Sequence, residues 1–191
     1  LQMLGKTAEF KDPETNAHTQ RVAYYCKLLA RAYGLDENLQ DIIFYASPFH
    51  DLGKIGIPDK ILLKPAKLDT DEYEIMKRHS QIGYEILKGS KSKYLKAGGV
   101  IAYNHHEKYD ETGYPNGLKG ESIPIFGRIT AVADVFDALT SSRPYKKAWS
   151  LEEAFDFLIE EKSVHFDPKL VDLFLENKNE VINIHNKFKE D

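Results

Sequence analysis

The sequence predicts an all-α fold, and three observations support that class. Apolar residues recur at three- and four-residue intervals along most of the chain, which is the spacing of helices buried on one face. Several of these segments start with residues that cap helices, and two carry a capping-box pair. No convincing series of strand-like segments is visible. A chain of 191 residues fits one domain, so we expect a single domain spanning residues 1–191.

Two helices are predicted in the first part of the chain. Asp12 followed by Pro13 is typical of a helix start, and the apolar stripe that follows runs to about residue 34. Asp36 is the expected N-cap of the second helix. Pro48 should bend that helix, which we expect to stop around Gly53.

The middle of the chain predicts a long helix, a short helix and a loop. Asp69 and Glu72 form a capping-box pattern at the start of the long helix. Apolar residues around Val100 mark the short helix. Residues 108–125 contain three glycines and two prolines, so we expect a loop there.

Three further helices are predicted in the last part of the chain. The first contains the apolar run at residues 129–139. Ser150 and Glu153 form the second capping-box pattern and start the next helix. Asp167 followed by Pro168 opens the last helix, whose end is polar and expected to fray.

Composition and charge restrict the classes of function. The net charge of -4 does not predict a polyanion-binding surface, so we expect no nucleic-acid polymer as a partner. No apolar run approaches the ~18–20 residues that span a bilayer, so no membrane contact by this segment is expected. The single cysteine, Cys26, cannot form an internal disulfide and suits a reducing, cytoplasmic compartment. Because the first residue is Leu1, we interpret the chain as part of a longer protein with an N-terminal regulatory domain.

Five of the seven histidines and three acidic residues lie at positions where the predicted helices would direct their side chains toward the interior of the protein. Glu14 and His18 are four residues apart and therefore share one face of the first helix. Asp134 lies in an apolar run, where a carboxylate needs a cation or hydrogen-bond partners. The candidate metal ligands are Glu14, His18, His50, Asp51, His79, His105, His106 and Asp134.

One histidine on an apolar helix face is usually a hydrogen-bonded core residue, but several helices that each offer a ligand indicate a metal site. Imidazole and carboxylate groups suit manganese, iron and zinc. Eight ligands exceed the coordination sphere of one ion, so we expect two or three divalent metal ions, iron or manganese before others. Such clusters typically hydrolyse phosphate esters. His165 and His185 lack this context and are expected to have no role in the site.

Several stretches of the sequence resemble the HD-GYP subfamily of the HD phosphohydrolase superfamily. The resemblance covers about residues 10–170, and it departs at Glu111, where the loop of the subfamily usually has glycine. The matching stretches are Asp12-Pro13-Glu14-Thr15 with His18 and Arg21, His50-Asp51 with residues 53–58, His105-His106-Glu107 with Gly113-Tyr114-Pro115, and residues 128–145.

The resemblance implies a helical bundle around a multinuclear metal site and a bacterial, metal-dependent phosphodiesterase. The implied substrate is cyclic di-GMP, and the implied product is linear pGpG, GMP or both. The eight candidate ligands match the subfamily's metal positions, with Asp51 bridging two ions and Glu14 adding a third. Lys54 would lie near the scissile phosphate and act with Asp51 in catalysis. Contacts with substrate are implied for Asp12, Tyr114, Asp137, Arg143 and Lys146.

Other interpretations stay open. The chain could be a different HD phosphohydrolase that cuts other nucleotides, or an HD-type di-iron oxygenase that holds redox-active iron with similar ligands. It could also be a cyclic di-GMP receptor that binds without turnover. From spacing alone, Arg143 and Lys146 are more often plain surface charges, and Gly113-Tyr114-Pro115 is more often a turn with a packed aromatic. A homodimer is also considered.

Overall fold

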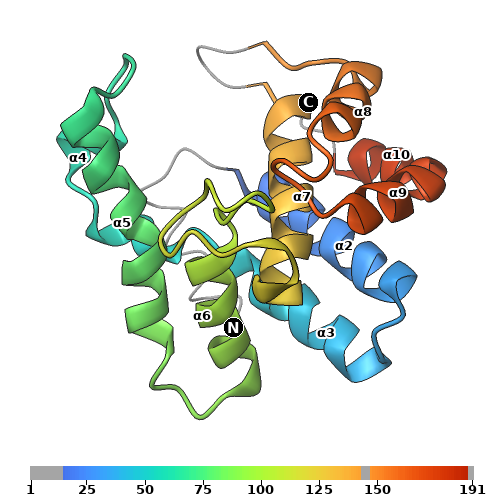
Figure 1. Ribbon diagram of the computed structural model, residues 1–191, viewed down its shortest axis with the longest axis horizontal. Coiled ribbons are helices and arrows are strands. Elements are labelled where there is room, and N and C mark those ends of the chain that lie inside the picture. Colours follow the sequence, from blue (N-terminus) through green and yellow to red (C-terminus); the bar gives the residue numbers. More distant parts are fainter. Residues whose placement is uncertain (1–14, 143–146, 189–191) are drawn as a thin grey trace.

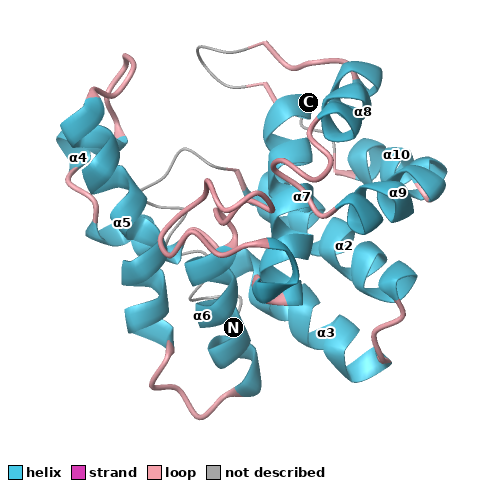
Figure 2. Ribbon diagram, viewed as in Figure 1, coloured by secondary structure: helices cyan, strands magenta, loops and turns pink. Residues whose placement is uncertain are grey.

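The computed structural model describes residues 15–142 and 147–188, whose helices pack into one bundle (Figure 1). The predicted all-α class is confirmed, because the described ranges contain helices and no strand (Figure 2). Two isolated β-bridges are present in these ranges: one joins Asp110 to Lys119, inside the predicted loop, and the other joins Lys162 to Phe166. Within the described residues, no helix combines the length and apolar character needed to cross a bilayer.

The first described helix, α2 (Asn16–Tyr33), begins later than predicted. Its N-cap is Thr15, whose side chain accepts a hydrogen bond from the backbone nitrogen of His18 at 3.3 Å. Asp12, the expected cap, lies outside the described residues. The start of α2 is therefore set by a hydroxyl cap one turn closer to His18.

The second predicted helix is present as α3 (Glu37–Ala46), with the predicted N-cap Asp36, but it ends at Ala46 and not around Gly53. The predicted bend near Pro48 is a change to 3₁₀ geometry. The 3₁₀ helices η1 (Ser47–Phe49) and η2 (Leu52–Gly56) continue the chain, with a single turn between them. A proline cannot donate a backbone hydrogen bond, which explains why the α-helix stops before it.

The middle of the chain folds into α4 (Asp59–Leu62), α5 (Thr70–Leu87) and α6 (Lys93–Asn104). The capping box predicted from Asp69 and Glu72 is present, because each side chain accepts a hydrogen bond from the backbone of the other. Helices α5 and α6 pack against each other along their lengths.

The last part of the chain differs from the prediction at one place. Ser150 and Glu153 form the predicted capping box. The expected last helix with a frayed end is instead two helices that meet at Asn177, and the second buries Val181 and Ile184. The elements of this part are η3 (Gly120–Ser122), α7 (Ile125–Thr140), α8 (Leu151–Glu160), α9 (Pro168–Glu176) and α10 (Lys178–Lys187).

The core between α2, α7, α8 and α9 is rich in aromatic rings. The ring of Tyr25 on α2 meets Phe136 edge to face at 5.6 Å and Phe174 at 5.7 Å. Phe136 also contacts Phe155, with 4.9 Å between ring centroids. Rings of this size bury large apolar areas and favour edge-to-face contacts. The packing therefore holds α2 and α7, which both carry candidate ligands, in one relative position.

A glycine brings η2 close to α5. A Cβ atom at Gly53 would lie 1.8 Å from the carbonyl oxygen of His79 and 2.5 Å from the backbone nitrogen of Gly83. No side chain fits in that space, so only glycine permits this approach. The contact places Asp51, just before η2, beside the turn of α5 that carries His79.

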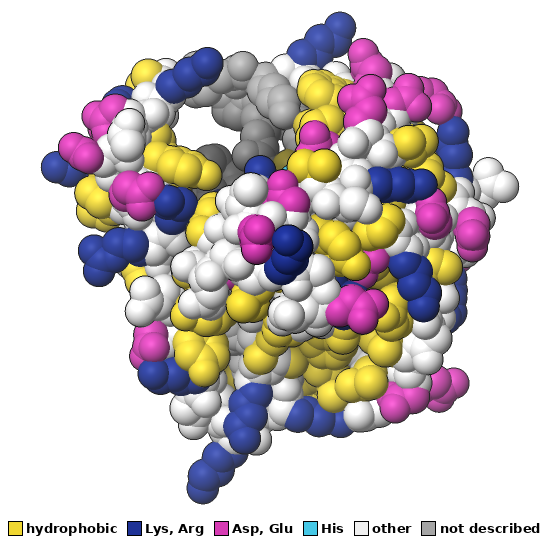
Figure 3. All heavy atoms as spheres, in the orientation of Figure 1, with side chains coloured by type: hydrophobic (Ala, Val, Ile, Leu, Met, Phe, Trp, Pro, Cys, Tyr) yellow, Lys and Arg dark blue, Asp and Glu magenta, His cyan; other side chains and the backbone are white. Residues whose placement is uncertain are grey.

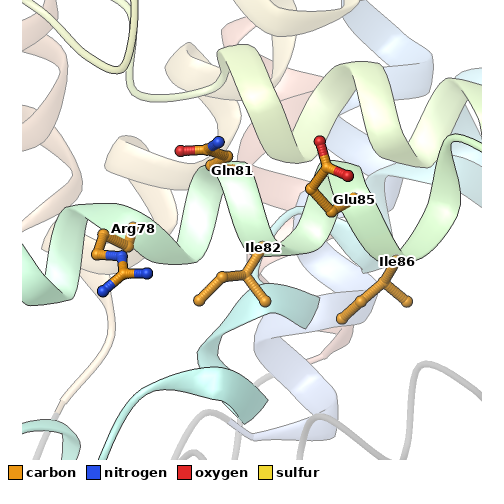
Figure 4. Close-up of a pocket in the computed structure, with 5 residues that line it drawn as sticks. All are labelled: Arg78, Gln81, Ile82, Glu85 and Ile86. Atoms are coloured by element: carbon orange, nitrogen blue, oxygen red, sulfur yellow. The ribbon is translucent and has the colours of Figure 1, made fainter.

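The face of α5 that carries no candidate ligand lines a pocket open to solvent. A shallow pocket of about 400 Å³ on this helix is lined by Arg78, Gln81, Ile82, Glu85 and Ile86 (Figure 4). None of these residues is a candidate ligand. His79, on the same helix, is only 2% exposed.

Candidate metal centre

The structure brings seven of the eight candidate ligands together in two adjoining groups. In each group, one donor atom per residue lies within 4.8 Å of those of the other members. The eighth candidate, Glu14, lies outside the described residues. The first group is Asp51, His79, His105 and His106, and the second is His18, His50 and Asp134.

The ligands reach the centre from five parts of the bundle. His18 is on α2, His79 on α5 and Asp134 on α7, while the remaining ligands lie at helix ends. His50 and Asp51 stand in the turn between η1 and η2, and His105 and His106 directly follow α6.

Asp51 lies between the two groups. Its Oδ1 atom is 3.2 Å from Nε2 of His79 and 3.6 Å from Nε2 of His105. Its Oδ2 atom is 3.2 Å from Nε2 of His50, which belongs to the other group. The two oxygens of one carboxylate therefore face different sets of imidazoles, as expected for a group that bridges two ions.

Asp134 completes the second group. Its Oδ1 atom lies 3.6 Å from Nε2 of His18 and 3.6 Å from Nε2 of His50. The side chain of Asp134 is 14% exposed, whereas those of both histidines are at least 95% buried. Asp134 thus lies on the more open side of the group.

Backbone carbonyls hold three of the imidazoles. Nδ1 of His50 donates to the carbonyl of Ser47 at 2.8 Å, and Nδ1 of His79 donates to that of Met76 at 2.7 Å. Nδ1 of His105 donates to the carbonyl of Ile101 at 3.1 Å. Because a carbonyl can only accept, each Nδ1 carries the proton and each Nε2 presents a lone pair to the centre.

The residues fit divalent metal ions. Asp51 Oδ1 and His105 Nε2 are buried and have no hydrogen-bond partner among the described residues. Nε2 of His106 lies 3.1 Å from Nε2 of His79, whose proton is on the other nitrogen. Converging lone pairs in a buried site are stabilised by a cation. The mixed imidazole and carboxylate donors suit iron, manganese, cobalt, nickel or zinc.

The protonation states also favour metal binding. Burial raises the pKa of Asp51, but the charges of Lys54 and His50 outweigh it and hold that pKa well below its usual range. Burial, with positive charge at His105 and His79, holds the pKa of His106 well below its usual value. Metals bind ionised carboxylates and neutral imidazoles, which are the forms that these shifts favour for Asp51 and His106.

Lys54 lies at the edge of the first group. Its Nζ atom is 2.8 Å from Oδ2 of Asp51, one helical turn away in η2, and its side chain is 16% exposed. Lys54 therefore lies beside Asp51, and its expected place near the scissile phosphate stays a prediction.

Asp137 lies behind the second group. A contact with substrate was expected for it, and in this structure its side chain is fully buried. Nδ1 of His18 donates to its Oδ2 atom at 2.8 Å, and Nε of Arg21 donates to its Oδ1 atom at 2.6 Å. Burial raises the pKa of Asp137, but His18 and Arg21 hold it below its usual value. In this position Asp137 orients the candidate ligand His18, and its expected contact with substrate stays a prediction.

The loop at residues 108–125 folds against the first group. The ring of Tyr114 stacks on His106, with 4.8 Å between centroids and 21° between planes. A Cβ at Gly113 would lie 2.2 Å from the backbone nitrogen of Lys108, so glycine is required for the loop to fold back. Glu111, which replaces the usual glycine, has a φ of 70° and keeps the left-handed backbone that glycine adopts readily.

Two buried charged residues in the matching stretches, Glu107 and Arg21, stabilise the surroundings of the centre. This role was not predicted from the sequence. Glu107 is 2% exposed and accepts hydrogen bonds from the backbone nitrogens of Asn116 and Leu118, at 2.8 and 2.9 Å. Arg21 is 4% exposed and holds Asp137. A charged residue next to candidate ligands in an apolar pattern is the signal that could have revealed both.

The other expected site residues are not tested by this geometry. Asp12 and Glu14 precede the described residues, and Arg143 and Lys146 fall in the gap at residues 143–146. His165 and His185 belong to neither ligand group.

Comparison with known proteins places the chain in a family. A family profile described as an HD domain matches residues 2–170. The chain is 47% identical over 188 residues to the Cyclic di-GMP phosphodiesterase response regulator RpfG of Xanthomonas campestris pv. campestris, covering 98% of this chain and 50% of the relative. It is 52% identical over 181 residues to the 3'3'-cGAMP-specific phosphodiesterase 2 of Vibrio cholerae, covering 95% of this chain and 35% of the relative. The chain thus spans about half of the first relative's length and about a third of the second's.

Solved structures show the same fold. A cyclic GMP-AMP specific phosphodiesterase of V. cholerae, V-cGAP3, matches with a TM-score of 0.70 at 21% identity, over 98% of this chain and 49% of that chain. The HD domain of the L. monocytogenes phosphodiesterase PgpH, in complex with cyclic-di-AMP, matches with a TM-score of 0.67 at 18% identity, over 98% of both chains. With its paired histidine and aspartate inside a helical bundle and its Gly-Tyr-Pro loop against them, the chain belongs to the HD domain family, in its HD-GYP branch.

Proposed function

We propose that this chain is a metal-dependent phosphodiesterase that hydrolyses cyclic di-GMP to linear pGpG, GMP or both. The observation that carries the proposal is the position of Asp51, whose two carboxylate oxygens face two separate groups of imidazoles. Two ions side by side are a common arrangement for the hydrolysis of phosphodiesters. The names of the relatives support a cyclic dinucleotide as substrate.

The metal ions would be iron or manganese, one held by each ligand group, and Glu14 would add a ligand for a third. When bound, such ions supply Lewis-acid stabilisation and a water of lowered pKa. The protein's part is to hold neutral imidazoles and ionised carboxylates in position before any substrate arrives. The carbonyl partners of His50, His79 and His105 do this by keeping each Nε2 directed at the centre.

Lys54 is the residue proposed to act on the substrate's charge. Its ammonium group, beside Asp51, would stabilise the negative charge that develops on the phosphoryl oxygens. Arg143, Lys146 and Asp12 are proposed as further contacts to phosphate and base. Tyr114 is proposed as the wall of the substrate site, because its ring already lies against His106.

A regulatory domain outside this chain is proposed to control the site, since the relatives are about two to three times longer. The reaction would take place in the cytoplasm, where nucleotide second messengers are made.

Product analysis tests the proposal. Protein loaded with iron or manganese is incubated with cyclic di-GMP, 3'3'-cGAMP and cyclic di-AMP, and the products are separated by chromatography. Linear dinucleotide or GMP from cyclic di-GMP is the expected result. Recovery of intact cyclic di-GMP with measurable affinity would indicate a receptor. Turnover of other nucleotides alone would indicate a different HD phosphohydrolase.

An Asp51→Asn variant provides the matched test of the site. It should lose bound metal and at least about 100-fold in turnover, because one neutral amide cannot bridge two cations. Asp41→Asn, an exposed aspartate paired with Lys27 on the surface, is the control and should behave like wild type. Full activity of the Asp51→Asn protein with its metal content unchanged would contradict the proposed site.

A further inference from the structure

In the first turns of α5, Tyr73 and Lys77 continue the series of side-chain contacts that leads from the metal centre toward solvent. Tyr114, which stacks on His106, also meets the ring of Tyr73 edge to face, with 6.4 Å between centroids. Tyr73 is 48% exposed, which is high for a large aromatic side chain. A continuous path of rings therefore leads from a metal ligand to an exposed tyrosine.

The ammonium group of Lys77 lies beside both tyrosines. Its Nζ atom is 5.5 Å from the ring centroid of Tyr73 and 5.7 Å from that of Tyr114. It also pairs with Glu74 at 2.6 Å, but the side chain of Glu74 is 62% exposed. Exposed ion pairs are weak, so this pair does not prevent the ammonium group from contacting a ligand.

Tyr73 and Lys77 lie on a part of the molecule that stands out from the bundle. Figure 1 shows this part as an arm formed by α4 with the first turns of α5, and Figure 3 shows the side chains on this face of the molecule. The tyrosines and Lys77 belong to the side of this arm that contacts the Gly-Tyr-Pro loop. A ligand at the metal centre would therefore meet these residues if it extended toward α4.

We propose that Tyr73, Tyr114 and Lys77 form a base-binding subsite that prefers guanine to adenine. The inference rests on the proposed function, and it names the part of the same site that reads the base of the nucleotide. Exposed tyrosine faces stack with any nucleobase. An ammonium group can only donate hydrogen bonds. Guanine offers two acceptors, O6 and N7, on one edge, whereas adenine has a donor beside N7. Lys77 therefore matches guanine and is repelled by the amino group of adenine.

The same side-chain set recurs at the other end of α5 without a metal centre beside it. Lys88 pairs with Glu85 at 2.5 Å and lies 5.8 Å from the ring centroid of Tyr84. Tyr84 stacks on Tyr103, with 4.8 Å between centroids. Lys88, the C-cap of α5, thus matches Lys77 in its ion pair and ring contact, and it serves as the control position.

Calorimetric binding of GMP and AMP to the metal-loaded protein tests the subsite. Neither is a diester, so binding is measured whether or not the protein hydrolyses cyclic di-GMP, and metal contacts to phosphate are common to both nucleotides. Wild type should bind GMP about tenfold more tightly than AMP. Tyr73→Ala should weaken both about tenfold by removing a stacking face, and Tyr73→Phe should retain wild-type affinity. Lys77→Met should lower the ratio of GMP to AMP affinity to about one, while Lys88→Met should leave it unchanged.

Three results would overturn the subsite. They are wild-type affinity in Tyr73→Ala, an unchanged GMP to AMP ratio in Lys77→Met, and no measurable binding of GMP by the wild type. Failure of the phosphodiesterase proposal is seen separately, as absence of products from cyclic di-GMP while the binding differences persist.

Discussion

The Oδ2 atom of Asp137 on α7 lies 2.8 Å from Nδ1 of His18 on α2, and Arg21 holds the same carboxylate from one turn further along α2. A guanidinium, a carboxylate and an imidazole thus form a chain that ends at a candidate metal ligand. The carboxylate fixes the tautomer and the direction of the ring, and it increases the basicity of Nε2. The second ligand group therefore depends on a residue that does not itself face the ions.

Asp137→Asn should weaken metal binding without removing a ligand. The amide keeps the size of the side chain but loses the charge, so metal affinity should fall about 10- to 100-fold. The variant should also lose about 3 kcal/mol or more of stability, because Arg21 stays buried without its counter-charge. Metal titration and thermal unfolding measure the two effects.

The control for this change is Ser141→Ala. The hydroxyl of Ser141 lies 3.2 Å from Oδ2 of Asp137 and accepts a hydrogen bond from Arg21 at 2.8 Å, so its removal leaves the charges in place. A loss of only about 1 kcal/mol is expected. Equal metal affinity in Asp137→Asn and wild type would show that His18 is oriented by packing alone.

Gly53→Ala should disrupt the centre through the backbone. The new Cβ would lie 1.8 Å from the carbonyl of His79, so η2 must move away from α5 and carry Asp51 with it. We expect a loss of about 3 kcal/mol or more, together with loss of bound metal. Gly89→Ala is the matched control, because a Cβ there meets no atom within 4 Å. Normal metal content in Gly53→Ala would contradict the role of this close approach.

Glu111→Gly should stabilise the protein. Glu111 has a φ of 70°, a region that an L side chain occupies at a cost of roughly 1 kcal/mol and that glycine occupies freely. The contact of Glu111 with Lys119 at 3.3 Å is exposed, so little is lost with it. A net gain of about 0.5 kcal/mol in the free energy of unfolding is expected after the greater chain entropy of glycine is subtracted. Chemical denaturation measures it, and a destabilised variant would show that the side chain supports the loop.

The stability of the protein should fall between about pH 6.5 and pH 4, in part because of His165. Burial, assisted by the charge of Lys108 and opposed by Asp110, lowers the pKa of His165 to about 4. The unfolded chain takes up the proton below pH 6.5 and the folded chain only below about pH 4, so stability is complete above this window and lost within it. The contribution is at most about 3 kcal/mol.

His165→Gln isolates this contribution, because the other histidines titrate in both proteins. Denaturation of metal-depleted wild type and variant at pH 7.5, 6, 5 and 4 should show a shallower decline in the variant. Parallel curves would mean that the ring of His165, which stacks on Phe166 at 4.2 Å, accepts a proton without penalty.

The sequence determined the features that depend on near neighbours. The capping boxes at Asp69 and Ser150, the N-cap of α3 at Asp36 and the all-α class follow from side chains within a few residues of each other. The types of ligand follow as well, because histidines and acids in apolar helical patterns must face inward. The break between α9 and α10 was not predicted, since the polar residues around Asn177 hide the buried Val181 and Ile184.

Only the tertiary structure decided how the candidate ligands divide into two groups and which of them lies between the groups. His18 and Asp137 are 119 residues apart, so no local pattern shows that they meet. On the same helix α7, Asp137 contacts Nδ1 of His18 while Asp134 lies near its Nε2. The position of Asp51 between two groups likewise depends on the contact of Gly53 with α5. Hydrogen bonds and close packing act over a few ångströms in space, and the folding of distant segments against each other creates those short distances.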